Sequence, residues 1–211
     1  MNQGPLSFDP ATLVVTRGDT VQWNWSIGIH TVTSGTGFAD PNVGALFDAP
    51  LDSANEFSYV FFDTVGAYPY HCIPHQLDGM TGTIVVTGDT TDVTQIGLLF
   101  SPANVNIRQG DTVRWTWNDG PHTVTSGTGF ADPNVGALFD APLDSANITF
   151  LYTFTDTLGT YPYHCIPHQL EGMNGTVTVE ANPFTGVAGP DFPVDPLEKE
   201  STWSDLKALF R

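Results

Sequence analysis

Basic residues are scarce in this sequence. Among its 211 residues there are 6 lysines and arginines against 23 aspartates and glutamates, which gives a formal net charge of −17 at pH 7. Proteins that bind nucleic acids neutralise phosphates with lysine and arginine, so this composition argues against a nucleic-acid partner. It favours a basic partner protein or a surface adapted to high salt, and a need for solubility alone explains the charge equally well.

Long apolar runs are absent as well. No stretch of about 18 consecutive apolar residues occurs, and we therefore expect no membrane-spanning helix. The N-terminal sequence MNQGPLSFDP lacks the basic region and the apolar region of a signal peptide.

Cysteine is limited to Cys72 and Cys165, which would allow a single disulfide in an oxidising compartment. Both cysteines lie within the same octapeptide, Tyr-Pro-Tyr-His-Cys-Ile-Pro-His, which occurs twice in the chain. A bridge between equivalent positions would require the two copies to face each other. We therefore expect the two cysteines to have separate roles.

The chain is an internal duplication. Phe8 corresponds to Phe100, and His30–Asn55 is repeated without change as His122–Asn147. A long period found only twice indicates two complete domains rather than a solenoid. The predicted organisation is a first domain at 1–88, a linker at 89–95, a second domain at 96–181 and a tail at 182–211.

Each copy has the pattern of an all-β domain. Val21, Trp23 and Trp25 alternate with polar residues, as do their counterparts in the second copy, and this period of two is typical of a half-buried strand. Short runs rich in β-branched and aromatic residues lie between turn signals, which predicts a sandwich or barrel. The polar, turn-rich segment 89–95 is the expected linker.

The tail differs from both copies. Its four prolines predict an extended arm, and Ser201 is expected to cap a short C-terminal helix with an apolar stripe. Such a stripe is expected to dock either on the same chain or on another subunit. The second option would allow a homo-oligomer, such as a trimer, held through the tail.

Potential metal ligands recur in the two copies. In each, a distant histidine is followed by the spacing Cys-x2-His-x4-Met. A thiolate, two imidazoles and a weak axial thioether form the donor set of blue-copper sites, whereas zinc favours another cysteine or histidine over a thioether. The predicted metal ligands, which are also the predicted cofactor-binding residues, are His30, Cys72, His75 and Met80 in the first copy and His122, Cys165, His168 and Met173 in the second.

These segments also carry a family resemblance. Tyr68–Met80 and its copy, Tyr161–Met173, resemble the copper loop of plastocyanins, pseudoazurins and halocyanins. The resemblance covers about residues 5–88 and 96–181. It implies two tandem cupredoxin domains, each a Greek-key β-sandwich with one type 1 copper, that exchange electrons with redox partner proteins. We expect an extracellular or periplasmic protein whose signal or anchor is not present in this sequence.

His71 and His164, which precede the cysteines, leave two classes of function open. Neighbouring strand residues point to opposite faces, so these rings are expected to point away from the adjacent copper. Copper nitrite reductases and multicopper oxidases use a histidine at this place to hold a further, catalytic copper. Of six histidines, however, only these two remain for such a site. An electron carrier with no catalytic residue is therefore favoured over a two-domain copper oxidoreductase with an interface copper.

The two copper sites are predicted to differ in reduction potential. In the first copy Ile27 lies three residues before His30, whereas in the second copy Asp119 lies three residues before His122, which changes the polarity beside one ligand. Asp78 of the first copy is also replaced by Glu171 in the second, near the methionine. A redox titration should therefore resolve two transitions. A single transition with both coppers equivalent would contradict this prediction.

Overall fold

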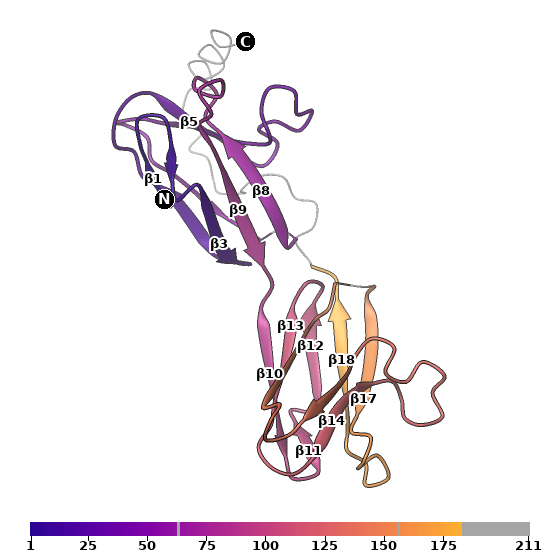
Figure 1. Ribbon diagram of the computed structural model, residues 1–211. Coiled ribbons are helices and arrows are strands. Elements are labelled where there is room, and N and C mark those ends of the chain that lie inside the picture. Colours follow the sequence, from indigo (N-terminus) through magenta and orange to yellow (C-terminus); the bar gives the residue numbers. More distant parts are fainter. Residues whose placement is uncertain (63, 156, 183–211) are drawn as a thin grey trace, which may run out of the picture. The chain divides into compact units, whose positions relative to one another are not determined.

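The computed structural model describes residues 1–62, 64–155 and 157–182, and within these ranges it contains strands and no helix. The predicted all-β class is confirmed. Contacts divide the described chain into two compact units, 1–87 and 88–182, called domain 1 and domain 2 below (Figure 1). The predicted tail, with its short C-terminal helix, lies outside the described residues apart from Asn182. None of the described segments is a helix that could cross a membrane.

Domain 1 contains nine strands in two layers. One layer is a five-stranded sheet in the order β3-β9-β8-β5-β6, in which β3 and β9 run parallel and the other neighbours antiparallel. The other layer consists of the pairs β4-β7 and β1-β2, which an isolated bridge between Asn2 and Asn24 connects. The strands are β1 Asn2–Gln3, β2 Phe8–Asp9, β3 Thr12–Thr16, β4 Thr20–Trp23, β5 His30–Ser34, β6 Asp48–Leu51, β7 Phe57–Val60, β8 Gly66–His71 and β9 Thr81–Thr87.

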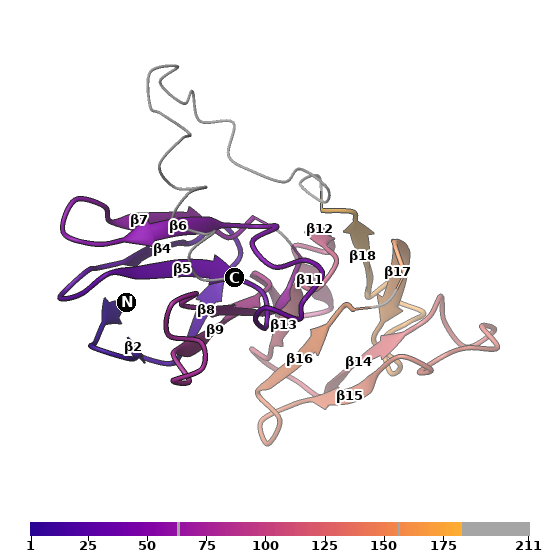
Figure 2. The ribbon, with the colours of Figure 1, turned by 90° about the horizontal axis from the view of Figure 1, so that it is seen from above.

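Domain 2 repeats this architecture. Its five-stranded sheet has the equivalent order β12-β18-β17-β14-β15, with β14 and β15 side by side (Figure 2). Its second layer is a continuous four-stranded sheet, β11-β10-β13-β16. The strands are β10 Thr90–Ile96, β11 Leu99–Ser101, β12 Asn104–Arg108, β13 Thr112–Thr116, β14 His122–Ser126, β15 Asp140–Leu143, β16 Thr149–Thr153, β17 Gly159–His164 and β18 Asn174–Glu180.

The core of each domain is built from aromatic rings between its two layers. Trp115 is fully buried, and its ring centroid lies 5.3–5.7 Å from those of Phe139, Phe150 and Tyr163. Trp23 occupies the same place in domain 1. The tryptophans that alternate with polar residues in the sequence therefore point inward, as the period of two predicted.

The predicted linker at 89–95 is wrong, because these residues form most of β10. This strand pairs in parallel with β13, and Val93 lies opposite Trp115 in that register. Val93 and Gln95 are fully buried. The segment looks like a linker because a buried glutamine and several threonines make its composition polar. Burial of the polar Gln95 side chain is compensated by hydrogen bonds, because its Oε1 accepts from the amides of Asn118 and Asp119.

We predict that Val93→Ala destabilises domain 2 by about 1.5–3 kcal/mol, because a fully buried valine side chain contributes about that much. Calorimetric unfolding of the full chain measures the change. Thr90→Ala, on an exposed part of the same strand, is the matched control and should change the free energy of unfolding by much less. Equal, negligible effects of both substitutions would mean that the segment behaves as a linker.

Candidate metal centres

Two groups of three potential ligands converge, one in each domain. In domain 1 the Sγ of Cys72 lies 3.6 Å from Nδ1 of His30 and 3.4 Å from Nδ1 of His75. Domain 2 has the same separations, 3.6 Å to His122 and 3.4 Å to His168 from the Sγ of Cys165. The ring centroids of the two histidines are 4.7 Å apart in both domains.

The positions of these ligands follow from the strands. His30 is the first residue of β5, and Cys72 directly follows the end of β8. A tight turn then brings the chain back, because the His75 amide donates to the Cys72 carbonyl at 3.2 Å and the Met80 amide donates to the His75 carbonyl at 3.1 Å. Gly79 has a φ of +82° within this turn, a conformation that favours glycine. Domain 2 contains the same turn between Cys165 and Met173.

The cysteine sulfur is oriented by the neighbouring strand. The amide of Thr31 donates to the Sγ of Cys72 at 3.4 Å, and the hydroxyl of Thr31 accepts a hydrogen bond from the Ile73 amide at 2.8 Å. An amide that donates to sulfur stabilises the thiolate form, which is the form that binds metals. Thr123 makes both contacts in domain 2.

Burial favours neutral side chains at these sites. It lowers the pKa of His30, and the neighbouring His75 ring lowers it further. Burial and then His168 lower the pKa of His122 in the same way. Burial also raises the pKa of the Cys72 thiol. A neutral imidazole offers a free lone pair, and in His30 the Nε2 atom lies 3.0 Å from the Ile27 carbonyl, which fixes the proton there and leaves Nδ1 free for a metal.

The donor atoms have the spacing of ligands around one ion. With metal–ligand bonds of about 2.0–2.3 Å, sulfur and nitrogen ligands in tetrahedral or trigonal sites lie roughly 3.3–3.8 Å apart. The separations of 3.4 and 3.6 Å fall within this range in both domains. Met80 and Met173 follow the same loops and are fully buried. Each domain therefore brings together a cysteine sulfur and two imidazoles, with a buried methionine in the same loop, and sulfur and imidazole donors of this kind suit copper.

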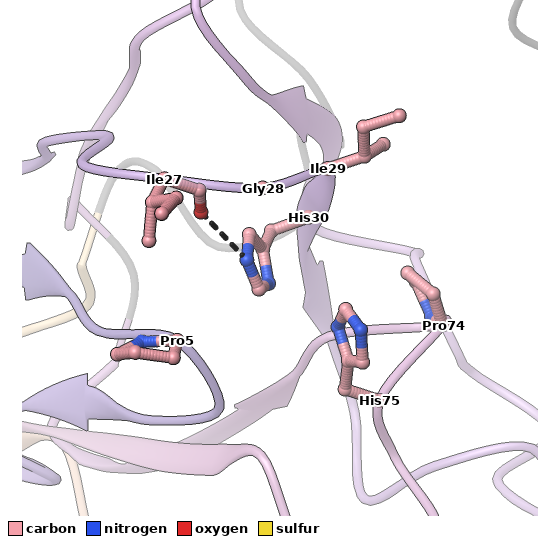
Figure 3. Close-up of a pocket in the computed structure, with 7 residues that line it drawn as sticks. All are labelled: Pro5, Ile27, Gly28, Ile29, His30, Pro74 and His75. Carbon is pink, nitrogen blue, oxygen red and sulfur yellow. Dashed lines mark hydrogen bonds between the residues drawn. The ribbon is translucent and has the colours of Figure 1, made fainter.

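An apolar hollow of about 500 Å³ opens beside the site of domain 1. Figure 3 shows the residues that line it. His30 and His75 form part of its wall, and the Ile27 carbonyl faces the His30 ring (Figure 3). Ile27 and Ile29 are more than half exposed, and His75 is half-buried. The remaining lining residues are Pro5, Gly28 and Pro74.

The corresponding rim in domain 2 is more polar. Asp119 stands at the position of Ile27, and its Oδ1 accepts a hydrogen bond from Gln95 Nε2 at 3.2 Å. The same Gln95 nitrogen lies 3.0 Å from Nε2 of His122. This amide hydrogen bond, followed by one from Asn118, holds the pKa of Asp119 below its ordinary value.

His71 and His164 lie apart from both donor groups. Each is buried, and its Nδ1 lies 3.1 Å from a backbone carbonyl, that of Gly35 or Gly127. Their Nε2 atoms are buried and have no hydrogen-bond partner among the described residues. The described part of the chain contains no further cluster of histidine, cysteine or carboxylate ligands that includes either ring.

Several residues at the sites were not identified from the sequence. The backbone amide of Phe38 donates to Oε1 of Gln76 at 3.0 Å, and this contact ties the loop after β5 to the turn that carries His75. Gln169 does the same in domain 2. Thr31 and Gln95 also act beside the ligands. Their recurrence in both copies of the repeat is the one signal that marks them, since glutamine and threonine are otherwise common surface residues.

Comparison with known proteins relates this chain to one family of copper-binding proteins. The model of copper-binding proteins of the plastocyanin/azurin family matches residues 1–87 and 89–180. Plastocyanin of Scenedesmus fuscus is 38% identical over 39% of this chain and 88% of its own length. Halocyanin of Natronomonas pharaonis is 35% identical over 48% of this chain and 58% of its own length. The solved oxidised plastocyanin of Dryopteris crassirhizoma is 22% identical, with a TM-score of 0.36, over 43% of this chain and its whole length.

We predict that metal binding at domain 1 displaces the proton of Cys72 but none from His30, because burial keeps the thiol protonated and the imidazole neutral at pH 7. Zinc affinity of the metal-free Cys165→Ser chain should therefore rise by about tenfold per unit between pH 7 and pH 8. Competition with a chromophoric chelator measures this. Adding Cys72→Ser should remove the dependence, and an affinity independent of pH would contradict the prediction.

Proposed function

The chain belongs to the plastocyanin/azurin family of copper-binding proteins, and we propose that it is an electron-transfer protein with one type 1 copper centre in each domain. The observation that carries this proposal is the convergence of one cysteine and two histidines in each domain. In both domains the cysteine Sγ lies 3.6 Å from Nδ1 of the first histidine and 3.4 Å from Nδ1 of the second. Copper bound at such a site supplies a one-electron Cu(I)/Cu(II) couple.

We assign the ligands by the roles that their positions allow. The cysteine and the two histidines of each group would hold the copper, and the buried methionine of the same loop would add a thioether sulfur as a weaker donor. The proposed ligands are His30, Cys72, His75 and Met80 in domain 1 and His122, Cys165, His168 and Met173 in domain 2.

The protein's contribution is to hold this donor set in one arrangement. The first histidine lies on a strand, and the cysteine directly follows the neighbouring strand that pairs with it. The second histidine and the methionine lie in a turn closed by backbone hydrogen bonds. Cys72 and Met80 belong to the same buried cluster as Trp23. Ligands fixed by a packed core change position little when the charge of the site changes, so an electron moves with little reorganisation.

The second histidine of each site is the proposed edge for electron entry and exit. His75 is half-buried and lines the apolar hollow, whereas His30 is almost fully buried. Leu77, two residues further along the same loop, is 93% exposed, and its counterpart Leu170 is 90% exposed. These apolar side chains provide a surface on which a redox partner protein brings its own centre close to the ring.

The charge of the chain bears on its partners. With 23 acidic residues against 6 basic ones, it repels acidic surfaces and attracts basic ones. We propose a redox partner with a basic rim around its docking surface. We also place the protein outside the cytoplasm, in an extracellular or periplasmic compartment.

The alternative function, a copper oxidoreductase with an extra copper held by His71 and His164, has less support. Both rings are buried, and each Nδ1 is used by a backbone carbonyl. A catalytic copper needs about three protein ligands and an open position for the substrate, and the described residues around these rings offer no third ligand.

The proposal predicts two copper ions per chain and an intense blue colour with type 1 EPR signals. Cys72→Ser and Cys165→Ser should each remove one copper and about half of the visible absorption, because a serine hydroxyl does not replace the thiolate. Metal analysis and absorption spectroscopy measure both changes.

His71→Phe and His164→Phe are the matched controls, since each changes the residue next to a cysteine. Both should retain two coppers and the full blue absorption. A third copper with a type 2 EPR signal, lost in these two variants and accompanied by turnover of nitrite or oxygen, would support the oxidoreductase instead. A chain that binds no copper would overturn both functions.

A further inference from the structure

The two metal sites share one geometry but differ in charge at one neighbouring position. Sulfur–nitrogen separations and the distance between the histidine rings are the same in both domains. Asp78 and its counterpart Glu171 carry the same charge. At the rim of the site, domain 2 has the charged residue Asp119 where domain 1 has the apolar residue Ile27. This substitution adds one negative charge at the rim of the domain 2 site.

The Asp119 carboxylate lies close to the first histidine of domain 2. Gln95 Nε2 donates hydrogen bonds to the Gly97 carbonyl at 2.7 Å and to the Asp119 carboxylate at 3.2 Å, and this nitrogen lies 3.0 Å from His122 Nε2. Gln95 Oε1 accepts a hydrogen bond from the Asp119 backbone amide at 3.0 Å. The carboxylate is thus held one amide group away from a proposed copper ligand. An aspartate carboxylate is ionised at neutral pH, so Asp119 carries a negative charge.

Domain 1 has the same buried glutamine without the carboxylate. Gln3 Oε1 accepts hydrogen bonds from the backbone amides of Ser26 and Ile27, at 3.1 and 3.3 Å. The Ile27 side chain lines the apolar hollow together with Pro5 and Ile29. Apolar groups at this rim give no compensation for positive charge.

A negative charge beside a metal stabilises its higher oxidation state, and an apolar surrounding disfavours the more highly charged state. We propose that Asp119 gives the copper centre of domain 2 a lower reduction potential than that of domain 1. This ordering rests on the proposed function. In this proposal Asp119 determines which of the two centres has the lower reduction potential. When the chain carries a single electron, that electron therefore resides on the copper of domain 1.

The ordering has a consequence for the partners. Electron exchange from domain 2 to domain 1 is downhill by whatever route it takes. A weak reductant then reduces domain 1 alone, and only a stronger one reduces both centres. The two domains thereby serve redox partners of different potential.

The test uses the full chain with one centre removed at a time. Cys165→Ser leaves the domain 1 centre, and Cys72→Ser leaves the domain 2 centre. Spectroelectrochemical titration of the two variants should give equilibrium constants for reduction that favour domain 1 by at least about tenfold, which is about 59 mV for a one-electron couple. One copper per chain in each variant shows that the remaining site is intact.

Charge variants then assign the difference to its residue. In the chain with both coppers, Asp119→Asn should raise the lower potential and leave the higher one unchanged. Ile27→Asp should lower the domain 1 potential, whereas Ile27→Asn, which adds polarity without charge, should lower it much less. Glu180→Gln removes the same charge at the far end of β18, roughly 20 Å from the metal loop, and should leave both potentials unchanged.

The possible failures are distinguishable. Two blue centres of equal potential, the reverse order, or no response to Asp119→Asn would overturn this ordering while leaving the electron-transfer function intact. A chain that binds no copper in either domain would instead overturn the proposed function, and the ordering with it.

Discussion

The pairing register between the strand of the first histidine and the strand that precedes the cysteine determines where both groups of candidate metal ligands form. In domain 1, β5 pairs with β8 so that Thr33 lies opposite His71, and β14 and β17 pair equivalently in domain 2. This register places Cys72, one residue beyond the strand, against the amide of Thr31, which donates to its sulfur. A slip of one residue would turn every side chain of the strand to the other face, so that the core and the donor set would be lost together.

The site and the core are consequently one structure. Cys165 and Met173 belong to the buried cluster that contains Trp115 and Tyr163, so the aromatic packing that holds the two layers together also supports the donor atoms. Because a close-packed interior resists deformation, the sulfur and nitrogen atoms keep their separations. The buried His71 and His164 belong to this scaffold, since each is bonded to the backbone at the start of the loop that covers the turn.

Duplication gives an internal comparison that a single domain does not offer. Where the copies agree, as in the separations between donor atoms, the shared fold is the cause. Where they differ, as at Ile27 and Asp119, the difference acts beside donor groups of the same geometry. The buried glutamines Gln3 and Gln95 illustrate both cases. Their Oε1 atoms accept hydrogen bonds from the backbone amides at two equivalent positions of each copy. Of the two, Gln95 alone also donates a hydrogen bond to a carboxylate.

The sequence by itself determined the all-β class, the duplication and the residues that converge at the metal groups. Periodicity identified Trp23 and Trp115 as core residues, and repeated spacing identified the cysteines and histidines, because both signals are local and occur twice. Local composition misjudged 89–95, since Val93 and Gln95 become core residues only when β13 pairs with β10. Only the tertiary structure decided where the Gln95 amide points and that His71 and His164 are buried, because these depend on contacts between segments far apart in the chain.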